Sequence, residues 1–125
     1  LALQIKELGA DVTVVDGLQV NSLGYYTSQY SSNDNSELYI SIINERLRLL
    51  KKSKVKILIN DLRDYHIVSK IISEEKPDCI VHLAAIAHAN RSNKDPFSTF
   101  DHSMRTLENV LDGSKNMGIH LIYFF

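Results

Sequence analysis

Residues able to bind a ligand follow three apolar runs of this sequence. The three sets are Asp16 after residues 11–15, Asp61 with Leu62 after residues 55–59, and Ala84–Ala85 after residues 77–83. A carboxylate accepts hydrogen bonds from hydroxyl or amino groups, and alanine leaves room for a flat group to lie against the backbone. If the three runs are parallel strands, their carboxyl ends share one edge of a sheet, which is where open α/β sheets bind ligands.

Together these strand ends favour a dinucleotide as the ligand. In dinucleotide-binding folds a carboxylate after the second strand, here Asp16, accepts hydrogen bonds from the adenosine ribose and repels a 2′-phosphate, which favours NAD over NADP. Asp61 can accept from an adenine amino group while Leu62 covers the ring. Each feature also has a simpler interpretation. The two aspartates can be turn residues that bind their own backbone, and Ala84–Ala85 can serve tight packing between helix and sheet.

The histidines do not predict a metal site. His82, His88, His102 and His120 lack the spacing of two ligands on one helix, and no cysteine pair accompanies them. We interpret His82 as a core histidine of its strand. His88 and His102 are candidates for substrate contact. Arg91 is a candidate for binding an anionic substrate group, or alternatively a solvated surface charge.

Helical and extended patterns alternate along the chain. Gly9 and Gly118 are typical helix C-termini, whereas Asp64 and Pro96 suit helix N-termini. The predicted helices are residues 1–9, 37–52, 64–76 and 96–117, and the predicted strands are residues 11–16, 55–59, 77–83 and 119–125. This alternation predicts the α/β class with right-handed crossovers and a Rossmann-like, doubly wound parallel sheet.

Composition narrows the classes of function. The 125 residues suffice for one domain, and a net charge of −1 gives no electrostatic case for a nucleic-acid partner. No apolar run has the roughly 18 residues that cross a membrane. The single cysteine, Cys79, excludes an internal disulfide, favours a cytoplasmic setting, and is expected to be a small buried hydrophobic residue. Residues 20–36 are polar and aperiodic, which predicts a long loop inserted into the domain.

The sequence resembles the NAD-dependent epimerase/dehydratase family of extended short-chain dehydrogenases, whose best-known members act on nucleotide sugars. The resemblance rests on Val14-Val15-Asp16, on residues 60–64 (Asn-Asp-Leu-Arg-Asp), and on residues 77–85 with their His-Leu-Ala-Ala ending. Residues 91–92, 95–96 and 106–111 continue it in register. It covers nearly the whole chain except the loop of about residues 20–35.

The resemblance implies roles for individual residues around NAD and a nucleotide-sugar substrate. Asp16 is implied to bind the adenosine ribose, with Gly17 where many members have asparagine and Asn21 as a possible replacement. Asp61 and Leu62 are the implied adenine contacts. A shelf beneath the pyrophosphate and nicotinamide ribose is implied for Leu83, Ala84, Ala85 and Ile86, with Ser103 facing the cofactor. The implied substrate contacts are Asn90 and Arg91, which add to His88, already a candidate from the sequence itself.

Several elements of the family are expected outside this chain. The first strand and its glycine-rich turn are expected before Leu1, and the catalytic Ser/Thr and Tyr-x-x-x-Lys pair after Phe125. We therefore expect an incomplete NAD-binding domain over residues 1–125, without catalytic residues. The expected parent is an epimerase or dehydratase, with dimerisation through the helix of residues 97–117. The alternatives are a non-catalytic dinucleotide-binding sensor or scaffold and a flavodoxin-like domain.

Overall fold

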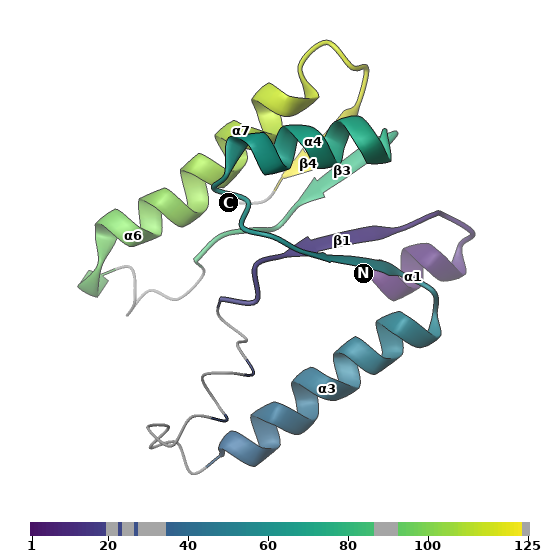
Figure 1. Cartoon of the computed structure of the whole chain (residues 1–125), viewed down its shortest axis with the longest axis vertical. Helices are drawn as coiled ribbons and strands as arrows, with labels where there is room; N and C mark the ends of the chain where they lie inside the picture. The colour runs from purple at the N-terminus through teal and green to yellow at the C-terminus, as the bar shows by residue number, and fades with distance from the viewer. Residues whose placement is uncertain (20–22, 24–26, 28–34, 87–92, 124–125) are drawn as a thin grey trace. The chain divides into compact units, whose positions relative to one another are not determined.

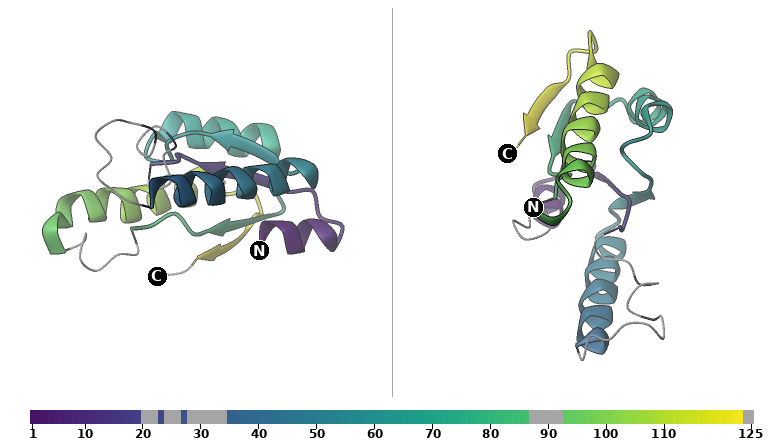
Figure 2. Two further views of the ribbon diagram at one scale, coloured as in Figure 1. Left: turned by 90° about the horizontal axis from the view of Figure 1, so that it is seen from below. Right: turned by 90° about the vertical axis from the view of Figure 1, so that its left-hand side faces the viewer.

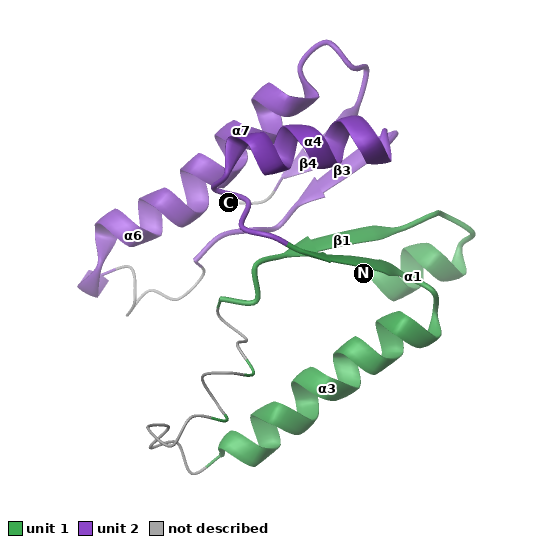
Figure 3. Ribbon diagram, in the orientation of Figure 1, with its two compact units in different colours: residues 1–59 green, residues 60–125 purple. Residues whose placement is uncertain are grey.

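The computed structural model of the chain describes residues 1–19, 23, 27, 35–86 and 93–123. These residues divide into two compact units, Leu1–Ile59 and Asn60–Phe125 (Figure 3). Each unit contains one parallel pair of strands with helices packed beside it. The α/β class and the parallel strand direction predicted from the sequence are therefore confirmed.

The first unit begins with helix α1 (Ala2–Glu7) and contains β1 (Thr13–Asp16), α3 (Ser36–Lys52) and β2 (Lys56–Ile59) (Figure 1). Glycine ends α1 as predicted, because Gly9 adopts a φ of +95°. Two backbone hydrogen bonds close the last turn: Gly9 N donates to Lys6 O, and Ala10 N donates to Ile5 O. β1 and β2 pair in register from Thr13 opposite Lys56 to Asp16 opposite Ile59.

The second unit contains α4 (Tyr65–Glu75), β3 (Cys79–His82), α6 (Pro96–Phe100), η1 (Asp101–Arg105), α7 (Thr106–Ser114) and β4 (His120–Tyr123). β3 and β4 pair in parallel from Cys79 opposite His120 to His82 opposite Tyr123. Helices α4 and α7 pack together around Val68, Ile72 and Val110. Leu62, Ile80, Ile119 and Leu121 complete this core.

α6, η1 and α7 form one continuous helical rod (Figure 2). Its middle turn, η1, is a π-helix. The sequence predicted an uninterrupted α-helix here, ending at Gly118. Instead the rod ends at Ser114, because Lys115 takes an extended conformation with ψ 130°. The left-handed residues Asn116 and Gly118, at φ 63° and 69°, then form the connection to β4.

Among the described residues, the strands form two two-stranded sheets, β1–β2 and β3–β4. One further expectation needs correction. Cys79 is exposed, because it opens β3, whereas burial concentrates at His82, the end of the strand that α7 covers. The apolar residues Phe97 and Phe100 of the rod are exposed, at 82% and 66%.

Candidate functional site

Asp16 ends β1 with an exposed carboxylate. Its Oδ1 accepts a hydrogen bond of 2.8 Å from the backbone N–H of Leu18, which has φ 51°. This is the local turn that the simpler interpretation of Asp16 requires, and it holds the carboxylate beside Gly17. A shallow, mostly apolar hollow of about 130 Å³ adjoins Asp16 between β1, β2 and α3.

The turn after Asn60 is held by its own side chains. Asp61 Oδ1 accepts from Arg63 N at 2.9 Å, and the backbone N–H of Asp64 donates to Asp61 O at 3.2 Å. The Asp64 side chain then accepts from His66 N and Ile67 N, which caps α4 as the sequence predicted. The turn is therefore defined by local hydrogen bonds on both sides of Leu62.

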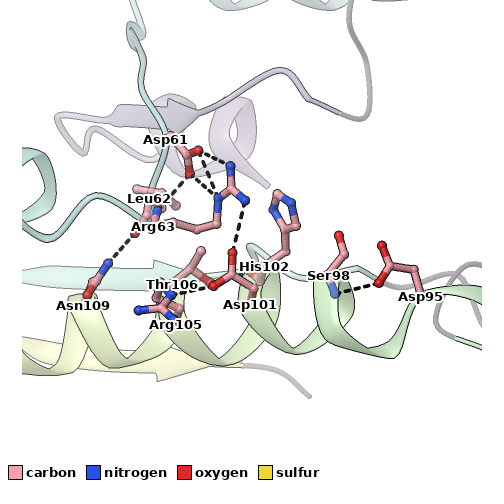
Figure 4. Close-up of polar contacts among 10 residues, drawn as sticks. All are labelled: Asp61, Leu62, Arg63, Asp95, Ser98, Asp101, His102, Arg105, Thr106 and Asn109. Atoms are coloured by element: carbon pink, nitrogen blue, oxygen red, sulfur yellow. Dashed lines mark hydrogen bonds and ion pairs between the residues drawn. The ribbon is translucent and has the colours of Figure 1, made fainter.

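Helix α7 also holds this turn in place, through a hydrogen bond. The buried Asn109 donates from Nδ2 to the carbonyl oxygen of Leu62 at 2.9 Å (Figure 4). Because a buried amide without a partner is costly, this hydrogen bond fixes the position of Leu62 relative to α7. Sequence reasoning missed Asn109, since a polar residue on a helix is ordinarily assigned to the solvent face.

Arg63 links the turn to η1. Its Nε lies 3.0 Å from both carboxylate oxygens of Asp61, and its Nη2 lies 2.6 Å from Asp61 Oδ2. The remaining terminal nitrogen, Nη1, donates to Asp101 Oδ2 at 3.1 Å, and Arg105 Nε donates to Asp101 Oδ1 (Figure 4). Hydrogen bonds from Arg105 and then Arg63 lower the pKa of Asp101, and the Asp61 carboxylate raises the pKa of Arg63.

The shelf residues follow β3 and contact the same helical rod. Leu83 and Ala85 are exposed, and Ala84 and Ile86 are half-buried. The backbone N–H of Ile86 donates to Ser103 Oγ of η1 at 3.2 Å. Ser103 therefore contacts the shelf itself, through a hydrogen bond that the sequence did not predict.

A buried polar pair lies beneath the shelf. Thr106 Oγ1 lies 3.3 Å from Ala84 O, 2.9 Å from His102 O and 3.5 Å from His82 Nε2. Burial lowers the pKa of His82, which keeps its ring neutral near pH 7. The interpretation of His82 as a core histidine is confirmed, since only 6% of it is exposed.

The second unit thus gathers two of the three predicted strand ends onto one helical rod. The turn of Asp61 and Leu62 is joined to the rod by the hydrogen bonds of Arg63 with Asp101 and of Asn109 with Leu62 O. The shelf is joined to the rod by hydrogen bonds to Ser103 and Thr106. π-Helical turns recur at functional sites, and η1 supplies both Asp101 and Ser103. Asp16 and Gly17 belong to the first unit. Asn21, His88, Asn90 and Arg91 lie outside the described residues.

Comparison with known proteins supports this assignment of the fold. A family model described as GDP-mannose 4,6 dehydratase matches residues 19–124. A UDP-glucose 4-epimerase of Lacticaseibacillus casei is 41% identical over 64 residues, which is 51% of this chain and 19% of that protein. The corresponding enzyme of Mycoplasma genitalium is 27% identical over 114 residues, covering 85% of this chain and 34% of that protein.

Solved structures of epimerases share the fold. The UDP-glucose 4-epimerase of Stenotrophomonas maltophila, with bound NAD and formylated UDP-arabinopyranose, superposes with a TM-score of 0.67 at 18% identity over 98% of this chain. The UDP-Glc/GlcNAc 4-epimerase of Campylobacter jejuni gives a TM-score of 0.68 at 20% identity over 97%. The chain spans 31% of each of these structures, and about a third or less of the matched relatives above.

The parallel strands, the helices packed beside them and the likeness to the epimerase structures define an α/β protein with a Rossmann-type fold. Because the family model covers most of its length, the chain belongs to the GDP-mannose 4,6 dehydratase family of NAD-dependent epimerases and dehydratases. No helix within the described residues is long and apolar enough to cross a membrane.

Proposed function

We propose that this chain is the NAD-binding part of a nucleotide-sugar epimerase or dehydratase. The observation that carries the proposal is the family match over residues 19–124, which spans Asp61 and the shelf. The site's chemistry supports it. The exposed Asp16 and Asp61 with its turn supply carboxylate acceptors at strand ends, and small residues follow β3.

The proposed contacts divide the cofactor among the strand ends. Asp16, with Gly17 and Asn21, binds the adenosine ribose, and the Asp16 carboxylate disfavours a 2′-phosphate. Asp61 accepts from the adenine amino group, and Leu62 covers the adenine ring. Leu83, Ala84, Ala85 and Ile86 lie beneath the pyrophosphate and nicotinamide ribose. Ser103 Oγ accepts from Ile86 N and, as a hydroxyl, also has a proton to donate toward the cofactor.

The proposed reaction is a hydride transfer between a sugar carbon and NAD. A hydride leaves the carbon that carries a hydroxyl group, and the hydroxyl proton passes to a base, which gives a transient keto sugar. After rearrangement, hydride and proton return to the sugar. We assign His88, Asn90 and Arg91 to the nucleotide-sugar substrate. The sequence holds no Tyr-x-x-x-Lys pair, and we assign no residue of this chain to the base.

A homodimer is the proposed assembly. The apolar residues exposed on the rod are Phe97, Phe100, Met104 and Leu111. Exposed apolar surface on one helix is typical of a protein–protein interface, and this surface lies on the helix that the resemblance implies for dimerisation.

The experiment uses the protein expressed from its complete gene. NAD binding is measured by calorimetry, and turnover is measured with a panel of UDP-, GDP- and dTDP-sugars. Binding with turnover supports the enzyme. Binding without turnover on any sugar favours the sensor or scaffold of the same fold, and absence of NAD binding contradicts the whole proposal.

A further inference from the structure

Arg63 makes four contacts that the proposed cofactor roles leave unexplained. Its backbone N–H, Nε and Nη2 all engage the Asp61 carboxylate, and its Nη1 engages Asp101 on η1. We propose that Arg63, anchored by Asp101, is a positioning residue that orients the Asp61 carboxylate toward the adenine amino group and thereby sets selectivity for the adenine base. This inference rests on the proposed binding of NAD.

The contacts define the orientation of the carboxylate almost completely. The hydrogen bond from Arg63 N fixes Asp61 Oδ1 over its own turn, at 2.9 Å. The planar guanidinium then meets both oxygens from one side, with Nε 3.0 Å from each and Nη2 2.6 Å from Oδ2. A two-pronged donor holds the plane of a carboxylate, whereas the ammonium of lysine acts as a point charge and leaves that plane undefined.

Asp101 prevents the guanidinium from turning away. It accepts from Arg63 Nη1 at 3.1 Å and from Arg105 Nε, and its side chain is 20% exposed. Asp61, Asp101, Arg63 and Arg105 together carry two negative and two positive charges, so the cluster, in which only Arg105 is exposed, is neutral. The pKa of Asp101 lies below its ordinary value, which keeps this anchor ionised through neutral pH.

A carboxylate held in one orientation distinguishes adenine from hypoxanthine. The 6-amino group of adenine donates a hydrogen bond, whereas hypoxanthine presents a carbonyl oxygen at that position. An anionic acceptor attracts the first group and repels the second. A carboxylate able to rotate accommodates both bases, because it can turn toward the N1–H of hypoxanthine.

The test compares NAD with nicotinamide hypoxanthine dinucleotide, using the protein expressed from its complete gene. Dissociation constants of both are measured by calorimetry for the unsubstituted protein, R63Q, R63K and D101N. The matched control is R48Q, because Arg48 makes the same two-pronged contact with Glu45 on α3. The ratio of the two constants is independent of the fraction of folded protein, so partial unfolding of a variant does not mimic the effect.

We expect the unsubstituted protein and R48Q to prefer NAD by roughly 10- to 100-fold, as a hydrogen bond to a charged group provides. In R63Q the preference falls to within about threefold, and R63K and D101N give intermediate ratios. An unchanged ratio in both R63Q and R63K overturns the inference while NAD binding stands. Equal binding of both dinucleotides by the unsubstituted protein also overturns it, and absence of NAD binding overturns it together with the proposed function.

Discussion

Replacing Asn109 by aspartate tests whether α7 holds the Asp61 turn through one buried donor. Asn109 is 7% exposed, and its Nδ2 donates to Leu62 O at 2.9 Å. In N109D an oxygen replaces this nitrogen. An ionised carboxylate there faces a carbonyl oxygen in a site shielded from water, so the folded protein must either bear that repulsion or bind a proton.

The free energy needed to protonate the introduced carboxyl group sets the upper limit of the stability that N109D loses. A neutral carboxyl group has an O–H that can donate to Leu62 O and restore the hydrogen bond. Keeping a carboxyl of ordinary pKa about 3.9 protonated at pH 7 costs about 4 kcal/mol, at about 1.4 kcal/mol per pH unit. We therefore expect N109D to lower the free energy of unfolding by about 3–4 kcal/mol at pH 7, and by about 1.5 kcal/mol at pH 5.

The sign of the pH dependence follows from proton binding. The introduced carboxyl has a raised pKa in the folded state, so between its unfolded and folded pKa values the folded state binds more protons. The stability of N109D relative to the unsubstituted protein therefore falls as pH rises. N109A removes the donor without adding a charge, so its cost of about 1–3 kcal/mol is independent of pH.

Urea unfolding followed by circular dichroism, at several pH values between about 5 and about 8, measures these differences. N44D is the control, because Asn44 is exposed on α3 and its exchange should change stability by no more than about 0.5 kcal/mol. If N109D and N44D lose equal stability, or if the N109D penalty does not change with pH, the argument that Asn109 acts as a buried donor is wrong.

Three further results are expected. D64A removes the side-chain acceptor for two backbone N–H groups of α4 and should lower the free energy of unfolding, measured by thermal unfolding, by about 1 kcal/mol. D64N keeps an acceptor and should be nearly as stable as the unsubstituted protein, so equal losses in both variants would contradict the capping role. Because the pKa of His82 is lowered in the folded protein, the unfolded state binds more protons below about pH 6.5, and stability should fall on acidification by up to about 1.4 kcal/mol per pH unit. H82Q should flatten this dependence of stability on pH. An identical slope in H82Q would show that His82 does not cause it. On the proposed function, D16N should reduce the preference for NAD over NADP by about tenfold, measured as the ratio of dissociation constants, and an unchanged ratio would remove Asp16 from the ribose site.

Locally determined features were predicted well from the sequence. Gly9 ends α1 with a positive φ, and Asp64 caps α4 with its side chain. Asp95, one residue before the predicted Pro96 start, caps the helical rod by accepting from Ser98 N. Each of these signals acts within four residues, so it requires no knowledge of the rest of the fold.

No pattern of neighbouring residues predicts that η1 is a π-helix. Asp101 and Arg105 stand four residues apart, which suits an ordinary ion pair on an α-helix. Two residues of η1 contact segments that are distant in the sequence. Asp101 accepts a hydrogen bond from Arg63 Nη1, 38 residues away, and Ser103 accepts one from Ile86 N. The Asp-Leu-Arg-Asp run did hold a usable signal for Arg63, since an aspartate two residues before it favours the turn that brings their side chains together.

The rod shows why apolar periodicity alone does not identify its buried face. Phe97, Phe100 and Met104 recur at helical spacing, which ordinarily marks the face of a helix that packs on the core, yet all three are exposed. Thr106 and Asn109 are buried instead, because they reach carbonyl groups at the ends of strands, Ala84 O and Leu62 O. Strand-end loops expose backbone acceptors that a sheet no longer satisfies, so a helix that covers them needs donors there. Polar residues spaced by three on a helix beside such loops are therefore evidence for the position of the loops.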